Sequence, residues 1–244
     1  MGLQFQIYVP VSYVAVIEAL GRQRADIAMI NSFGYLIAHE KYGAEARLIG
    51  VNSGKKTYKG LIIAHKDGKV KSVKDIDGRT FAFVDPSSTS GYVLASQLLK
   101  VNKINPKETV FAGRHDSVVT MVYQKQVDAG AIFYSPDSEE GKPQDARVLV
   151  ETQFPDVLKQ VVIVGETQEI PNDPVAFRKD FPLELKEKIA QELKNYIRTA
   201  DGNKVFYEMY HAKDFDDTKD QEYNVLRDIV QNLNLDVSKL LKKK

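Results

Sequence analysis

Residues 85–92, DPSSTSGY, concentrate hydroxyl groups at the point where an apolar stretch gives way to helical spacing. The preceding RTFAFVD is typical of a strand, so the hydroxyl residues lie between a predicted strand and a predicted helix. A helix N-terminus leaves backbone N–H groups unpaired and carries roughly half a positive charge. Ser88, Thr89 and Ser90 add donors there, and Gly91 allows a ligand to approach the backbone. The pattern suits a tetrahedral oxyanion such as phosphate or phosphonate.

The turn contains no lysine or arginine, so an anion would be held by neutral donors and the helix dipole. A hydrogen bond to a charged group contributes on the order of 1.5–3 kcal/mol, and five or more would offset the desolvation of a dianion. In open α/β sheets, ligands bind beyond the carboxyl ends of the strands, where this turn lies. The residues alone equally permit a Ser/Thr-rich helix cap that binds nothing.

Three more side chains stand at the starts of expected elements and carry donors suited to an anion. Tyr13 begins a helix, Tyr58 opens an apolar strand and His115 precedes a second helix. Lone tyrosines more often pack in a core, and a lone histidine is more often a surface or cap residue. From the residues alone, both alternatives stand for each of the three.

Motifs for catalysis and for metal or cofactor binding are absent from the sequence. It contains no GxSxG, HExxH, P-loop or Rossmann glycine fingerprint, and its four histidines show no metal-ligand spacing. We therefore predict no catalytic residue, no metal and no cofactor. This pattern argues against an enzyme.

The composition is that of an ordinary globular protein. Of 244 residues, 34 are basic and 33 acidic, and the net charge of +1 gives no general attraction to nucleic acid. The absence of cysteine excludes disulfides and thiolate chemistry. No apolar run approaches the roughly 18 residues of a membrane span, and no signal peptide is visible.

Short apolar strands alternate with amphipathic helices up to residue 170, which predicts an α/β fold with mainly parallel sheets. The expected strands are 3–9, 25–30, 46–52, 58–66, 79–85, 109–112, 128–133, 146–151 and 159–165. The expected helices are 13–20, closed by a left-handed Gly21, then 33–43, 90–100 and 116–125. After IPNDP (170–174) the pattern predicts helices only, with apolar faces at Leu185, Ile189, Leu193 and Ile197 and at Leu226, Ile229, Val230 and Leu233.

A weak internal repeat suggests two lobes with the same architecture. Residues 13–32 match the pattern of residues 115–134, each giving a helix, a polar turn and an Asp before a small-residue strand. Tyr13 and His115 then stand at equivalent helix N-termini. We expect lobe one to comprise residues 1–66 and 165–244, N-terminally incomplete, and lobe two to comprise 67–164.

Several stretches together carry a family resemblance. They are SYVAVIEAL, ADIAMINSFGYL, YKGLIIAHKD, VKDIDGRTFAFVDPSSTSGYVLASQLL, RHDSVVTMVYQKQVDAGA and IPNDPVAFRKDFP. In this order, the chain resembles the substrate-binding proteins of phosphate, phosphite and phosphonate ABC transporters, a group of type II periplasmic binding proteins. The resemblance implies two doubly wound α/β lobes joined by two crossover strands, with C-terminal helices. It also implies that the family's first strand and helix are missing here, which puts binding by this chain alone in question.

The resemblance also implies roles for individual residues. In the family, the Ser-Thr-Ser turn binds the phosphonate oxygens. The corresponding residues here are Ser88, Thr89 and Ser90. The family's two binding tyrosines and its histidine correspond to Tyr13, Tyr58 and His115.

One departure from the family concerns the ligand's tail. Members that take aminoalkylphosphonates hold the ammonium with acidic residues, one of them shortly after the segment VDAGA. Here Tyr134 and Ser135 stand where that acid is expected, with Asp137 nearby. We therefore expect Tyr134 at the site. Phosphate, phosphite or a small alkylphosphonate is favoured as the ligand over an aminophosphonate.

The function implied by the resemblance is that of the solute-binding component of an ABC importer. Its partners would be a small phosphorus oxyanion and, at the membrane, a permease with its ATPase, with no nucleic acid. The protein is expected to be a monomer, periplasmic or lipid-anchored outside the cytoplasm. The alternative is a ligand-sensing domain of a receptor or kinase built on the same fold.

Overall fold

The computed structural model describes residues 4–137 and 141–235. The α-helices are α1 (Tyr13–Gly21), α2 (Ser32–Tyr42), α3 (Ala95–Val101), α4 (His115–Tyr123), α5 (Val157–Gln160), α6 (Leu183–Ile197), α7 (Ala200–Tyr210) and α8 (Asn224–Asn232). The strands are β1 (Ile27–Met29), β2 (Glu45–Val51), β3 (Thr57–Tyr58), β4 (Gly60–His65), β5 (Thr80–Phe83), β6 (Glu108–Phe111), β7 (Ala129–Phe133), β8 (Val161–Glu166), β9 (Ile170–Pro171), β10 (Pro174–Phe177) and β11 (Asp214–Asp217). Short 3₁₀ helices are η1 (Val73–Ile76), η3 (Ala146–Val150) and η4 (Asp220–Tyr223), and η2 (Thr89–Leu94) is a π-helical turn. Across the described ranges, every helix is too short or too polar to cross a membrane.

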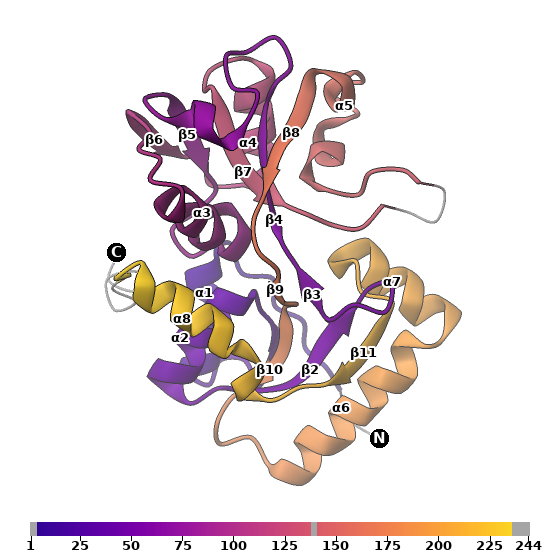
Figure 1. Cartoon of the computed structure of the whole chain (residues 1–244). Coiled ribbons are helices and arrows are strands. Elements are labelled where there is room, and N and C mark those ends of the chain that lie inside the picture. The colour runs from indigo at the N-terminus through magenta and orange to yellow at the C-terminus, as the bar shows by residue number, and fades with distance from the viewer. Residues whose placement is uncertain (1–3, 138–140, 236–244) are drawn as a thin grey trace.

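Two sheets with helices packed on them form the two parts of the molecule (Figure 1). The five-stranded sheet has the order β6-β5-β7-β4-β8, and the four-stranded sheet has the order β1-β10-β2-β11. Only β5 pairs in parallel, with β6 and β7; every other pair within these two sheets is antiparallel. The prediction of mainly parallel sheets is therefore wrong. The reason is that β4 and β8, at the passages between the sheets, and β10 and β11, which follow the return passage, run against their neighbours.

The chain passes between the sheets twice, and the passages meet in the two-stranded ladder β3–β9 (Figure 1). On one side of this ladder β4 pairs with both β7 and β8, so residues 60–65 and 161–166 belong to the five-stranded sheet. We propose that each sheet is the centre of one lobe. The two lobe boundaries would then lie at the β3–β9 ladder. The first would come before residue 66 and the second after residue 165, the positions predicted from the sequence.

Four of the predicted elements differ from the observed ones. Residues 4–9 have no regular secondary structure and are largely exposed, with Ile7 87% accessible, because no described strand lies beside them to complete a ladder. Residue 3 lies outside the described range. Residues 146–150 form η3 instead of a strand, since the Asp145 carboxylate accepts from the backbone N–H of Arg147 at 3.0 Å and pairs with its guanidinium. Gly21 lies inside α1, and the left-handed residue is Gln23 at φ 57°.

The fourth difference is the expectation of helices only after residue 170. The sequence there forms three strands, β9, β10 and β11, besides α6, α7 and α8. The pattern missed β10 because it is only four residues long and buried throughout, so it shows no alternation. It lies between β1 and β2 at the centre of its sheet, whereas the predicted faces of α6 and α8 are confirmed.

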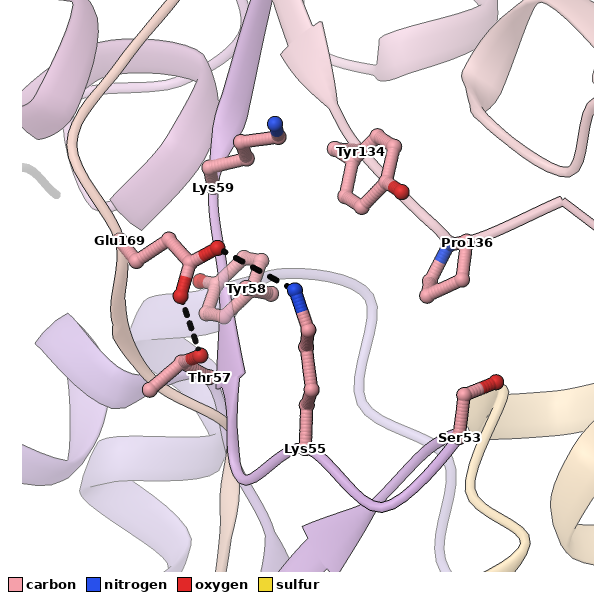
Figure 2. Close-up of a pocket in the computed structure, with 8 residues that line it drawn as sticks. All are labelled: Ser53, Lys55, Thr57, Tyr58, Lys59, Tyr134, Pro136 and Glu169. Atoms are coloured by element: carbon pink, nitrogen blue, oxygen red, sulfur yellow. Dashed lines mark hydrogen bonds and ion pairs between the residues drawn. The ribbon is translucent and has the colours of Figure 1, made fainter.

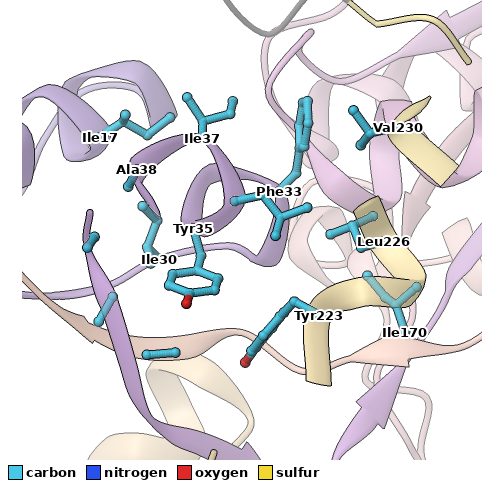
Figure 3. Packing of buried hydrophobic residues seen from close by; sticks show 14 of the residues in the cluster. Ile17, Ile30, Phe33, Tyr35, Ile37, Ala38, Ile170, Tyr223, Leu226 and Val230 are labelled. Carbon is cyan, nitrogen blue, oxygen red and sulfur yellow. The ribbon is translucent and has the colours of Figure 1, made fainter. Parts of the chain in front are cut away.

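The core around α2 joins the two parts of the molecule. Phe33, Tyr35 and Ile37 on α2 are fully buried and pack toward Ile17 of α1 on one side and Leu226 of α8 on the other (Figure 3). The same cluster includes Val93 and Leu94 of η2, which belong to the segment after β5. Apolar packing therefore fixes α2 next to the hydroxyl-rich turn.

The central place of β10 can be tested by mutation. Phe177 is fully buried on β10 among Leu48, Ile189 and Phe215. We expect Phe177→Ala to lower the free energy of unfolding by about 3–5 kcal/mol, because the cavity cannot collapse in a sheet centre. The control Leu183→Ala, at a 57% exposed position of α6, should change it by less than about 0.5 kcal/mol. Urea unfolding measures both; similar small losses would contradict this packing.

Candidate functional site

The turn between β5 and η2 buries four consecutive hydroxyl residues, Ser87 to Ser90. The Asp85 carboxylate accepts from the backbone N–H of Ser87 at 2.7 Å, which holds the turn after the strand. Ser88 is the N-cap of η2, and its Oγ accepts from the backbone N–H of Gly91 at 3.1 Å. One hydroxyl therefore caps the helix, as a simple cap requires, and Thr89 and Ser90 are left for other partners.

Gly91 has a packing reason that the sequence did not reveal. A Cβ on Gly91 would lie 2.4 Å from Cγ2 of Val84, so the turn folds back on the end of β5 only without a side chain here. Its backbone N–H already donates to Oγ of Ser88. A ligand contact at Gly91 stays a prediction, but packing alone accounts for the glycine.

The N-terminus of a second helix, α2, meets this turn. Oγ1 of Thr89 accepts from the backbone N–H of Phe33 and from the side-chain amide of Asn31, both at 3.0 Å. The Asn31 amide also donates to the carbonyl of Ser87 at 2.8 Å. The N-terminus of α2 thus meets the start of η2 at the Thr89 hydroxyl. Such a place favours a group rich in acceptor oxygens.

Tyr13 and Tyr58 both reach this point. The Tyr13 phenol is hydrogen-bonded to the Ser88 side chain, and desolvation raises the pKa of Tyr13 to about 12. The Tyr58 phenol is hydrogen-bonded to Thr89 and Ser32, and desolvation raises the pKa of Tyr58 well above its ordinary value. Both phenols therefore keep their protons at neutral pH and can serve as donors.

The Asp173 carboxylate also lies at this convergence. Its Oδ1 accepts from the backbone N–H of Ser32 at 2.9 Å and lies 3.0 Å from the Ser32 hydroxyl, and Tyr58 also hydrogen-bonds to it. Protein atoms surround the group on most sides, and this desolvation raises the pKa of Asp173 to about 6 despite the hydrogen bonds that favour the charge. Yet the residue keeps an exposed surface.

His115 is held in one protonation state by its neighbours. Its Nδ1 accepts from the backbone N–H of Phe133 at 3.2 Å, and the two rings lie 5.0 Å apart edge to face. Desolvation lowers the pKa of His115 to about 4, so the imidazole is neutral at pH 7. Because Nδ1 is the acceptor, the ring proton is on Nε2. His115 is therefore a neutral donor, like the two tyrosines.

Tyr134 lies on a pocket that Tyr58 also lines (Figure 2). Its backbone N–H donates to the carbonyl of Lys59 at 3.1 Å, and the Lys59 ammonium stands 4.8 Å from its ring centre. The predicted residues thus fall into two groups. Hydrogen bonds join Tyr13, Tyr58, Ser88 and Thr89, while His115 and Tyr134 flank Phe133, and Tyr58 connects the groups by lining the Tyr134 pocket.

The sequence reasoning missed Asn31, Ser32 and Asp173. Asn31 precedes α2 and could have been recognised as a polar residue at a helix start. Asp173 stands in NDP between prolines and was interpreted only as punctuation of the chain. No cluster of three or more potential metal ligands occurs among residues 4–137 and 141–235.

Solved structures define the class of fold. A binding protein component of an ABC phosphonate transporter from Pseudomonas aeruginosa superposes with a TM-score of 0.80 at 23% identity, over 96% of this chain and 76% of that one. PhnD1 from Prochlorococcus marinus, solved with methylphosphonate, gives 0.74 at 18% identity, over 91% of this chain and 84% of that one. The molecule has the fold of the type II periplasmic binding proteins, with two α/β lobes.

The family follows from the sequence comparison. The model for periplasmic substrate-binding proteins of phosphonate ABC transporters matches residues 1–223, and the chain belongs to this family. The resemblance seen in the sequence is thereby confirmed. The family comprises periplasmic binding proteins and not enzymes, in line with the prediction, and it implies an extracytoplasmic location.

Curated relatives are longer than this chain. The phosphonates-binding periplasmic protein of Escherichia coli is 24% identical over 215 residues, 84% of this chain and 60% of that protein. The phosphate-import protein PhnD of Mycolicibacterium smegmatis is 26% identical over 146 residues, 50% of this chain and 42% of that protein. The chain therefore spans less than two thirds of these two relatives.

The raised pKa of Asp173 predicts a pH-dependent stability. The folded protein keeps the Asp173 proton up to about pH 6, whereas the unfolded chain releases it near pH 3.8. The free energy of unfolding therefore decreases as the pH rises from about 3.8 to about 6. The exposed surface of Asp173 screens the charge, so we expect a loss of about 1–2 kcal/mol. Asp173→Asn should lack this loss, and the control Asp180→Asn at an exposed site should retain it. Urea unfolding between pH 4 and 7 measures the difference; parallel profiles for all three proteins would contradict the assignment.

Proposed function

We propose that this chain is the solute-binding component of an ABC importer that captures a tetrahedral phosphorus oxyanion between its lobes. The observation that carries the proposal is the meeting of the α2 N-terminus with the start of η2 at Thr89, without a basic residue in the turn. Phosphonate, phosphite and phosphate are the ligand candidates. Membership of the phosphonate-binding family supports this choice.

The donors at the site match an oxyanion in kind. Ser88, Thr89 and Ser90 contribute hydroxyls, Tyr13 and Tyr58 contribute phenols, and His115 contributes Nε2–H. All are neutral at pH 7, so binding relies on many oriented dipoles, which act strongly where water is scarce.

Binding would exchange one acceptor for another. Thr89 Oγ1 now accepts from the α2 N-terminus and from Asn31. A ligand oxygen entering between the lobes would take over these donors and leave the Thr89 hydroxyl free to donate. The lobes would move about the β3–β9 ladder, which consists of two residue pairs.

The partners follow from the same role. We propose that the protein acts as a monomer without nucleic acid, free in the periplasm or lipid-anchored, and that it delivers its ligand to a permease and its ATPase. The homologous relatives named for phosphonate binding and phosphate import support this assignment.

Calorimetry with phosphate, phosphite, methylphosphonate and 2-aminoethylphosphonate tests the function. We expect binding heat with at least one of the first three, and weaker or no binding of the aminophosphonate, because Ser135 replaces the expected acid. Absence of heat with all four at micromolar protein would refute the proposal.

Tyr13 offers a sharper test of the site because its phenol can be removed without changing the ring. We expect Tyr13→Phe to weaken binding of the preferred ligand about 10- to 100-fold, the loss of one hydrogen bond to a charged group. Tyr8→Phe, at an exposed tyrosine of the N-terminal segment, is the matched control and should bind as the parent does. Equal affinities of the two variants would place the anion elsewhere.

A further inference from the structure

A polar pocket beside the convergence is not explained by the binding of a phosphorus head group. It lies along the passage between the sheets, between the segment leading into β3 and the end of β7 (Figure 2). Its lining includes Lys55, Thr57, Tyr58, Lys59, Tyr134 and Glu169. The pocket is thus built from residues of both parts of the molecule.

Tyr58 connects this pocket to the head-group site. Its phenol is hydrogen-bonded to Thr89 and Ser32, while the residue also lines the pocket. Tyr134, which also lines the pocket, directly follows Phe133, and the backbone N–H of Phe133 donates to Nδ1 of His115. A substituent on a bound phosphorus atom therefore has the pocket as its neighbouring space.

The charged groups of the pocket are unevenly satisfied. Lys59 is ion-paired with Glu166 and covers the Tyr134 ring. Glu169 accepts from the Thr57 hydroxyl at 2.6 Å. The Lys55 ammonium forms a long ion pair with Glu169, at 3.8 Å, and makes no hydrogen bond within the described part of the chain (Figure 2). Lys55 can therefore accept a new anionic partner without breaking a hydrogen bond.

We infer that this pocket is a tail subsite that selects phosphonates bearing a carboxylate on a short substituent, with Lys55 as the principal partner and Lys59 and the Tyr134 hydroxyl beside it. The inference rests on the proposed function, since it requires the phosphorus group at the neighbouring site. The tail subsite would supply the specificity that the head-group donors lack, because those donors would bind all small phosphonates with similar affinity.

An ammonium-bearing tail fits the same pocket poorly. It would approach two lysines, and the lining carboxylate, Glu169, is already ion-paired with Lys55 and accepts from Thr57. Ser135, at the position of the expected acid, is 4% exposed, and Asp137 is exposed and is not part of the lining. Charge therefore favours an anionic tail over a cationic one.

Calorimetry with phosphonoacetate, methylphosphonate and 2-aminoethylphosphonate tests the subsite. We expect phosphonoacetate to bind about 5- to 10-fold more tightly than methylphosphonate, and the aminophosphonate to bind most weakly. Lys55→Gln should abolish the advantage of phosphonoacetate and leave methylphosphonate binding within about twofold. Lys66→Gln is the matched control, since Lys66 also faces a carboxylate at a long distance, 4.0 Å from Asp67, but lies outside the pocket.

The outcomes separate the two proposals. Methylphosphonate binding without an advantage for phosphonoacetate, or equal losses for both ligands in Lys55→Gln, overturns the tail subsite and leaves the proposed function intact. Tighter binding of the aminophosphonate than of phosphonoacetate also overturns it. No binding of any phosphonate or of inorganic phosphate by the parent protein refutes the proposed function, and the subsite with it.

Discussion

The meeting of two helix N-termini is the constraint on which the site depends. The backbone N–H of Phe33 points to Thr89 at the start of η2, and that of Ser32 points to Asp173. Each helix end carries roughly half a positive charge, so the two ends repel unless oxygen acceptors stand between them. The Thr89 hydroxyl and the Asp173 carboxylate meet this need, and a ligand oxyanion would meet it better.

The rest of the fold maintains this approach. Phe33 and Tyr35 bury α2 against α1 and α8, while Val93 and Leu94 of η2 enter the same cluster. The two passages between the sheets carry Tyr58 and Asp173 to the point where the helices meet. Enclosure by protein then keeps Tyr13, Tyr58 and His115 neutral, so these three side chains act as uncharged donors.

Sequence reasoning succeeded where local chemistry decides and failed where a distant partner decides. The turn at Ser88 was located because hydroxyls after an apolar strand are a local signal, and α6 and α8 were found from their apolar spacing. The strand β10 was missed because its four residues show no period, and only β1 and β2 on either side make it a strand. Residues 4–9 have strand composition but lack a described neighbour to pair with.

By itself, the sequence determined the kind of chemistry: a neutral, hydroxyl-rich turn at a helix start, the family, and the tyrosines and histidine worth considering. These follow from residue types within a few positions of one another. Only the tertiary structure decided what faces that turn. Phe33 meets Thr89 across 56 positions of the chain, and Ser32 meets Asp173 across 141. No local pattern encodes such a contact, because the packing of two sheets and the helices on them creates it.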